Sequence, residues 1–121
     1  MMALSSKVMG SGIDPLMLAA LFDVGAGLTA TGTNQATALT LVNGDNEFTT
    51  VAAGTGAVLY AGSPGDEQWV YNGGANVLTV YPNSGAKINS LPANQGVQIA
   101  KNTAITFKRM SSTRIVGVLS R

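Results

Sequence analysis

The sequence contains no histidine and no cysteine. Histidine is the usual general base and metal ligand near neutral pH, and cysteine is the strongest side-chain nucleophile. Without cysteine there is also no disulfide framework and no thiolate metal site. An enzyme would have to rely on six acidic residues, four lysines and hydroxyl groups. We therefore expect a non-enzymatic structural or binding protein with no catalytic residues, no cofactor and no metal.

Charge is also scarce, since charged residues make up 11% of the chain against about a quarter in typical soluble domains. The polar surface must come from Ser, Thr, Asn, Gln and Gly, which suits a dense assembly or an extracellular particle. A net charge of +1 favours neither nucleic acid nor anionic lipid as a partner. The small basic cluster of Lys108, Arg109, Arg114 and Arg121 has, apart from Phe107, none of the interleaved aromatics of a nucleic-acid site. No apolar run approaches the roughly 20 residues of a membrane-spanning helix, so we expect no membrane partner.

The few charges are unevenly distributed along the chain. All six acids precede residue 68, whereas six of the seven bases lie at or after Lys87. One interpretation is scattered, solvated charge. The other is that acidic and basic faces of neighbouring copies meet, and the sequence leaves both open.

What is present begins with a short helix signal behind an arm. Residues 1–13 show no hydrophobic period and cannot pack against themselves. Asp14 is a good N-cap, Pro15 suits the first helical position, and Gly25 follows the end of the pattern. The predicted helix at 16–22 is apolar all round, so it must be buried on several sides. It either closes one end of its own domain or inserts into a partner. We divide the chain into an arm and helix at 1–28 and a β-domain at 29–121.

From residue 29 onward the hydrophobic period is two, which is typical of β-strands. Turn residues such as Asn43-Gly44, Ser63-Pro64-Gly65 and Gly73-Gly74 separate the runs. Eight strands are predicted, at 35–42, 47–51, 57–61, 68–71, 77–81, 96–100, 103–108 and 114–119. This spacing predicts an all-β domain, either an antiparallel sandwich of jelly-roll type or a small barrel.

One hairpin can be predicted in detail, between the runs at 68–71 and 77–81. A five-residue connection sets Val70 opposite Leu78 on the core side. The core side would also take Leu39, Leu41, Ile105, Phe107 and either Ile115 or Val116. The opposite face then gathers Trp69, Tyr71 and Tyr81. These aromatics are packed under a covering layer, form a subunit contact, or make a platform on which a sugar ring stacks.

Other candidate sites are weak. Asp66 and Glu67 are adjacent, so on a strand they would point to opposite faces and could not work as a general acid and base. The run Asp45-Asn46-Glu47 lacks the donors and spacing of a calcium loop. Gly54-Thr55-Gly56 lacks the residues that complete a phosphate loop.

Several blocks occur in an order found in a known class of virion proteins. They are TATGTNQATAL (29–39), TTVAAGTG (49–56), VYNGGANVLTVYP (70–82) and GAKIN (85–89). From residue 29 to the C-terminus the chain resembles small β-domains of tailed-phage structural proteins. These include capsid decoration (cement) proteins and head-fibre components, which are often trimers on the outside of the shell.

The resemblance implies a decoration protein that binds the outer surface of the phage head and bridges neighbouring capsomers. Its partners would be the major capsid protein and two further copies of itself. The subunit contact would use Trp69, Tyr71 and Tyr81. The capsid-binding residues would be apolar residues of the arm and helix: Leu4, Met9, Ile13, Leu16, Met17, Leu18, Leu21 and Phe22. The alternative is a glycan- or receptor-binding module of a head fibre or tail, and a structural role in the tail or baseplate is a third possibility.

Overall fold

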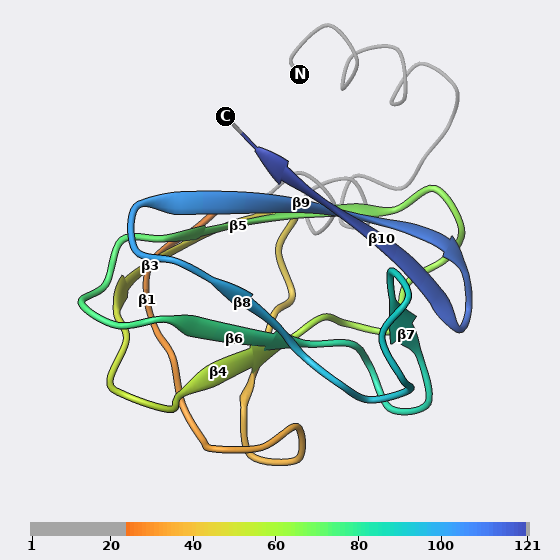
Figure 1. The fold of residues 1–121 in the computed structure, drawn as a ribbon. Helices are drawn as coiled ribbons and strands as arrows, with labels where there is room; N and C mark the ends of the chain where they lie inside the picture. The colour runs from red at the N-terminus through yellow and green to blue at the C-terminus, as the bar shows by residue number, and fades with distance from the viewer. Residues whose placement is uncertain (1–23, 121) are drawn as a thin grey trace, which may run out of the picture.

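The computed structural model describes residues 24–120, which form ten β-strands in two sheets (Figure 1). The larger sheet has the strand order β1 (Val24–Thr29), β3 (Asp45–Thr50), β5 (Glu67–Asn72), β9 (Thr103–Ser111), β10 (Arg114–Ser120), β7 (Lys87–Ile88). The smaller sheet has the order β2 (Leu39–Thr40), β4 (Gly56–Val58), β6 (Leu78–Tyr81), β8 (Val97–Ile99).

The prediction of an all-β domain is confirmed, and residues 24–120 contain no helix. The predicted helix at 16–22 and the eight predicted capsid-binding residues lie outside the described residues. Strand structure begins at Val24, within the segment assigned to the arm. Across the described part of the chain, no helix is long and apolar enough to cross a membrane.

The first six strands wind as a coil. The chain passes alternately from the six-stranded to the four-stranded sheet, and each return lays a strand parallel to the one before it. Thus β1, β3 and β5 are parallel neighbours, as are β2, β4 and β6. Val24 pairs with Asp45, and Asp45 with Trp69, so the turns of this coil take 21 and 24 residues. This winding is that of a short β-solenoid.

The coil ends where the strands reverse direction. Strand β8 runs antiparallel to β6, and β9 runs antiparallel to β5, so both sheets of the coil receive a reversed strand. Strand β10 returns antiparallel to β9, and the two-residue β7 lies parallel to β10 at the far edge. The two sheets face each other across a single core (Figure 1).

The predicted antiparallel sandwich, jelly roll or barrel is therefore wrong in strand direction, because five of the eight strand pairings are parallel. Turn-rich segments such as Ser63-Pro64-Gly65 do not fold a strand back on its neighbour. They carry the chain across to the other sheet. Each of the eight predicted runs overlaps a strand of the structure, whereas β1 and β7 were not predicted.

The predicted hairpin of residues 68–71 and 77–81 is wrong for the same reason. These runs are β5 and β6, which belong to different sheets. The side chain of Asn72 explains the crossing, because its Nδ2 donates to the carbonyls of Asn76 at 2.8 Å and Ile99 at 2.9 Å. Both bonds draw the connection toward the smaller sheet. The predicted assignment of faces nevertheless holds, since Val70 and Leu78 are fully buried.

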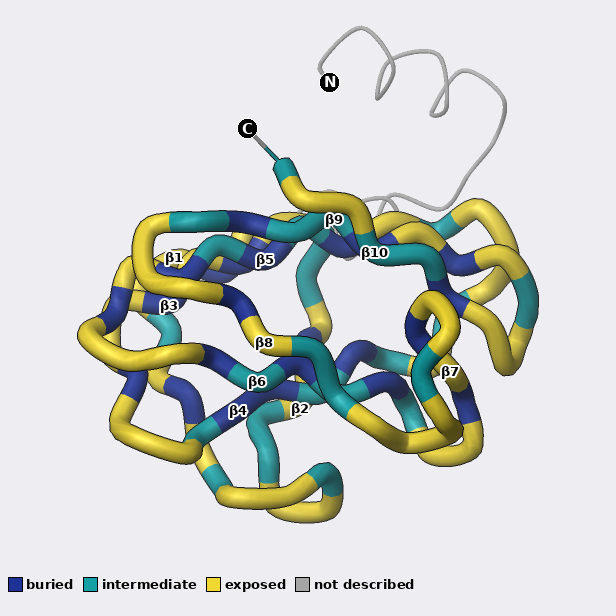
Figure 2. The backbone as a smooth tube through the Cα atoms, in the orientation of Figure 1, coloured by how far each residue is buried: buried dark blue, intermediate teal, exposed yellow. Residues whose placement is uncertain are grey.

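The core consists of apolar residues from both sheets, and buried residues alternate with more exposed ones along the strands (Figure 2). Among the predicted core residues, Leu41, Phe107 and Ile115 are buried, while Leu39 and Ile105 are partly buried at its margin. Ile115, and not Val116, is the inward residue of β10. The other buried apolar residues are Ala30, Phe48, Val51, Ala57, Leu59, Val70, Leu78, Val80, Ala86, Ile88, Ile99 and Ala104.

Three buried amide side chains on the inner face of the larger sheet form hydrogen bonds with backbone groups where the chain crosses from one sheet to the other. Gln68 donates to the carbonyls of Leu41 and Asn43. Asn46 donates to the carbonyl of Asn43 at 3.0 Å, and Asn72 donates to the carbonyl of Asn76 in the crossing from β5 to β6. Corner peptides lack a ladder partner, and a buried peptide group without a hydrogen bond is costly. Within residues 24–120, only Oδ1 of Asn46 is a buried side-chain polar atom without a partner.

Candidate interaction surface

The three aromatics predicted to form one contact surface do not share a face of the molecule. Trp69 and Tyr71 lie on β5 and point away from the core on the six-stranded sheet. Tyr81 lies on β6 of the four-stranded sheet, where its hydroxyl donates to the carbonyl of Thr33 at 3.4 Å. As a single aromatic surface the prediction is therefore wrong, because it assumed that β5 and β6 were neighbours.

Trp69 and Tyr71 themselves form a stacked pair. Their ring centroids are 5.9 Å apart and their planes differ by 11°. The Tyr71 hydroxyl donates to Oδ1 of Asn102 at 3.4 Å. Beside the rings is an open hollow of about 270 Å³. It is lined by Trp69, Tyr71, Asn102, Thr103, Ala104 and Ser120.

Strand pairing places two acids beside this aromatic pair. On β3, Asp45 is in register with Trp69 and Glu47 with Tyr71. Both acids are exposed and alternate with the buried Asn46 and Phe48, so they share the outer face with the rings. This proximity was not predicted from the sequence. Period-two alternation around Phe48 could have placed both acids on one face, but their neighbour depended on the parallel pairing of β3 with β5.

Charge is segregated across the six-stranded sheet. Strand β3, next to the β1 edge, carries Asp45 and Glu47, whereas β10 and β7 at the opposite edge carry Arg114 and Lys87. In the middle, Glu67 and Lys108 compensate each other at 3.7 Å, and theirs is the only ion pair among residues 24–120. Both side chains are more than half exposed, so the pair contributes little to stability. The sheet has an acidic side and a basic side.

The basic side also borders an open groove of about 620 Å³. Lys87 and Arg114 are register partners on adjacent strands, and both are exposed. The groove is otherwise lined by small polar residues and one glycine: Gly85, Asn89, Ser90, Ser111 and Thr113. Two like charges side by side on a sheet repel each other. An anionic group on a neighbouring molecule would relieve that repulsion.

Arg109 does not belong to an exposed basic cluster, because its side chain is only 5% exposed. Its guanidinium donates to the carbonyl of Tyr60 at 2.9 Å and to Oδ1 of Asn83 at 2.7 Å. It also reaches the carbonyls of Ser111 and Ser112. Arg109 thus joins the crossing from β4 to β5 and the crossing from β6 to β7 to the turn between β9 and β10, and it is a structural residue.

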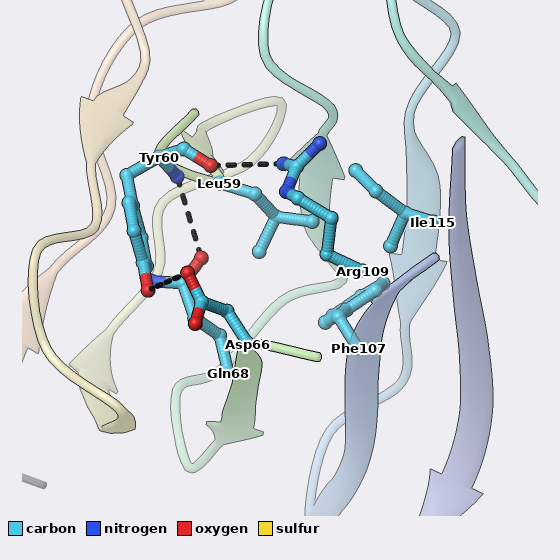
Figure 3. A pocket seen from close by; sticks show the side chains of 7 residues that line it. All are labelled: Leu59, Tyr60, Asp66, Gln68, Phe107, Arg109 and Ile115. Atoms are coloured by element: carbon cyan, nitrogen blue, oxygen red, sulfur yellow. Dashed lines mark hydrogen bonds between the residues drawn. The ribbon is translucent and has the colours of Figure 1, made fainter. Parts of the chain in front are cut away.

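Around Arg109 is a polar junction with Tyr60, Asp66 and Gln68 (Figure 3). The Tyr60 hydroxyl donates to Asp66 Oδ2 at 3.1 Å, and Gln68 Oε1 accepts from the Tyr60 amide. Burial, together with the negative charge of Asp66, raises the pKa of Tyr60 to about 12. Burial lowers the pKa of Arg109 below its ordinary value, while Tyr60 and Asp66 act in the opposite direction. The space of about 10 Å³ beside these side chains holds one water at most, so the junction is packed.

The remaining acids are not gathered into a site. Asp66 is held by Tyr60 and by the backbone amide of Ser63, whereas Glu67 points outward to Lys108. Within residues 24–120 no group of three or more acidic side chains is positioned to hold a metal ion. The expectation of a non-enzymatic protein without cofactor or metal stays a prediction.

The surface with the most chemical character in the described chain is thus the outer face of the six-stranded sheet. It combines an aromatic pair, an open hollow beside this pair and opposite charges at its two sides. Its function has to be argued from these residues. No protein-family model, no curated protein and no solved structure matches this chain.

Proposed function

We propose that this chain is a non-enzymatic structural protein of a tailed-phage virion, a capsid decoration (cement) protein on the outer surface of the head. In this role the apolar arm and helix of residues 1–22 grip the major capsid protein, and the β-domain bridges neighbouring capsomers. The sequence blocks given above supply the resemblance. Burial of apolar side chains at each site would contribute roughly 25 cal/mol per Å² before the cost of ordering.

The observation that carries the proposal is the position of β1. Among the described strands it is the outermost strand of the six-stranded sheet. The arm therefore joins the domain at a sheet edge, and the described core extends between the two sheets from Ala30 to Ile115. An arm joined at an edge can reach a neighbouring protein without disturbing that core.

Segregated charge supports self-association within the same role. When the acidic β3 side of one copy meets the basic β7–β10 side of the next, the contact is heterologous, and such contacts close into rings when the rotation permits. Three copies arranged in this way would form the expected homotrimer. The contact then uses Asp45 and Glu47 against Lys87 and Arg114, in place of the three aromatics.

The experiment removes residues 1–22 and measures co-sedimentation of the protein with undecorated capsids. We expect binding to be lost while the circular dichroism spectrum and thermal midpoint of the β-domain persist. Leu18→Ser with Phe22→Ser should weaken capsid binding, whereas Ser5→Ala with Ser6→Ala in the same segment should not. Unchanged binding of the truncated protein would refute the anchoring role.

A further inference from the structure

The hollow beside Trp69 and Tyr71 has the composition of a carbohydrate site. We propose that it binds a neutral saccharide, with a pyranose ring stacked on the aromatic pair. This inference does not rest on the capsid assignment, because it concerns the outer face of the six-stranded sheet and not the arm.

The aromatic pair supplies the stacking surface. Trp69 and Tyr71 are both partly exposed, and their rings are nearly parallel. One face of a pyranose presents mainly C–H groups, and these pack against the electron-rich face of an indole or phenol. The long hydrogen bond of 3.4 Å from the Tyr71 hydroxyl to Asn102 and the stacking on Trp69 favour one orientation of the phenol before any ligand arrives, which reduces the ordering cost of binding.

The rest of the lining supplies hydrogen bonds for sugar hydroxyls. Thr103 and Ser120 contribute hydroxyl groups, and Asn102 contributes an amide. Within residues 24–120 the Nδ2 group of Asn102 has no acceptor, so it remains a donor for a ligand. The Ser120 hydroxyl is held by Thr106 Oγ1 at 2.9 Å. A mostly apolar floor with a few positioned polar groups is the usual make-up of a small-molecule site.

Charge and size define the class of saccharide. None of the six lining residues is charged, and the nearest charges in register with the rings are the carboxylates of Asp45 and Glu47. Those carboxylates disfavour sialic or uronic acids and can accept hydrogen bonds from neutral sugars. The volume of about 270 Å³ is just below the usual range of roughly 300–1,000 Å³ for ligand sites. It fits one or two rings of an exposed chain.

Trp69 makes the site directly observable, because it is the only tryptophan of the chain. Purified protein would be applied to an array of neutral and acidic bacterial oligosaccharides. It would then be titrated with maltohexaose, cellohexaose and chitohexaose while tryptophan fluorescence is recorded. We expect saturable binding of neutral glycans, with a shift of the emission maximum.

Variants test whether the hollow is responsible, with affinity measured by calorimetry. Trp69→Ala and Tyr71→Ala should each weaken binding about tenfold or more, and Ser120→Ala should weaken it less. Tyr81→Ala is the matched control, because it removes an aromatic from the opposite sheet, and Trp69→Phe keeps the stacking surface if Trp69→Ala does not fold. Glu67→Gln should leave binding unchanged.

Three results would overturn the inference. These are an absence of glycan binding, selective binding of acidic glycans, and unchanged affinity in folded Trp69→Ala. If Trp69→Ala instead dissociates the oligomer in sedimentation and no glycan binds, the pair is a subunit contact. Capsid co-sedimentation is scored separately, so failure of the saccharide site and failure of the decoration role are distinguishable.

Discussion

Nδ2 of Asn72, on the larger sheet, donates a hydrogen bond to the carbonyl oxygen of Ile99, on the smaller sheet, at 2.9 Å through the core. The same amide group donates to Asn76, and its oxygen accepts from the amide of Gly74. One fully buried side chain therefore satisfies two backbone groups in the crossing from β5 to β6 and also binds a carbonyl of β8. The fold depends on such residues wherever the coil crosses between sheets.

Replacement of Asn72 by alanine should strongly destabilise the domain. The change leaves buried partners without hydrogen bonds, so we expect the free energy of unfolding to fall by about 2–4 kcal/mol. Urea denaturation followed by Trp69 fluorescence measures it. Gln98→Ala on the exposed face of β8 is the control and should change stability by less than about 0.5 kcal/mol. Equal effects of the two changes would contradict the role of Asn72.

Arg109 and its neighbour Lys108 offer a sharper comparison, because they are adjacent and both basic. Arg109→Met should cost about 3 kcal/mol or more, since it leaves Asn83 Oδ1 without a donor and removes the guanidinium from the Tyr60 carbonyl, which keeps only the Gly62 amide. Lys108→Met breaks only an exposed ion pair and should cost less than about 1 kcal/mol. Thermal unfolding of both variants decides the matter. A larger loss of stability for Lys108→Met than for Arg109→Met would contradict the structural role of Arg109.

Stability should fall at alkaline pH because of Tyr60. Its pKa is raised from 10.0 to about 12 in the folded state, so the folded state holds the phenol proton more tightly than the unfolded state does. The corresponding stability is fully present below pH 10 and is lost as the pH rises toward 12. Tyr60→Phe should flatten this part of the profile. Urea midpoints measured between pH 9 and 12 provide the check, and identical slopes in both proteins would count against the assignment.

The proposed acid-to-base contact predicts the outcome of a charge exchange. Asp45→Lys with Glu47→Lys should dissociate the oligomer, and Lys87→Glu with Arg114→Glu should do the same, because each pair of changes makes like charges meet. A mixture of the two variants should form mixed dimers, since both contacts between unlike variants join opposite charges, but it should not restore the closed trimer, because a ring of three must place two copies of one variant side by side. Sedimentation velocity at low and high salt measures this, and high salt should weaken the wild-type assembly. Lys101→Glu, in the turn before β9, should leave association intact.

The sequence predicted what depends on neighbours along the chain. Alternation around Val70 and Leu78 correctly separated core from surface, and every predicted strand exists. Hydrophobic alternation does not reveal parallel pairing, because the sequence of a strand alternates in the same way in a coil and in a hairpin. The sequence nevertheless contains a repeat. Gly44, Gly65 and Gly85 recur after 21 and 20 residues, each at a crossing from the smaller sheet to the larger sheet.

The interaction surface was predicted only in part, for the same reason. Trp69 and Tyr71 follow from alternation, whereas Asp45 and Ser120 join them through pairings that span the chain. The burial of Arg109 could have been predicted. Phe107 was assigned to the core, and a residue two positions further along a strand points the same way. A charged side chain at an inward position signals a buried network.

The winding of β1 to β6 also defines a direction in which the fold could be lengthened by further turns. Each turn of the coil pairs with the turns next to it, and β9 pairs with β5, the last coil strand of the larger sheet. A further segment of about twenty residues inserted between β3 and β5 would add one strand to each sheet. It would displace β9, β10 and β7 by a single strand spacing of about 4.8 Å. Relatives of different length could therefore keep the same two ends while differing in the distance between them.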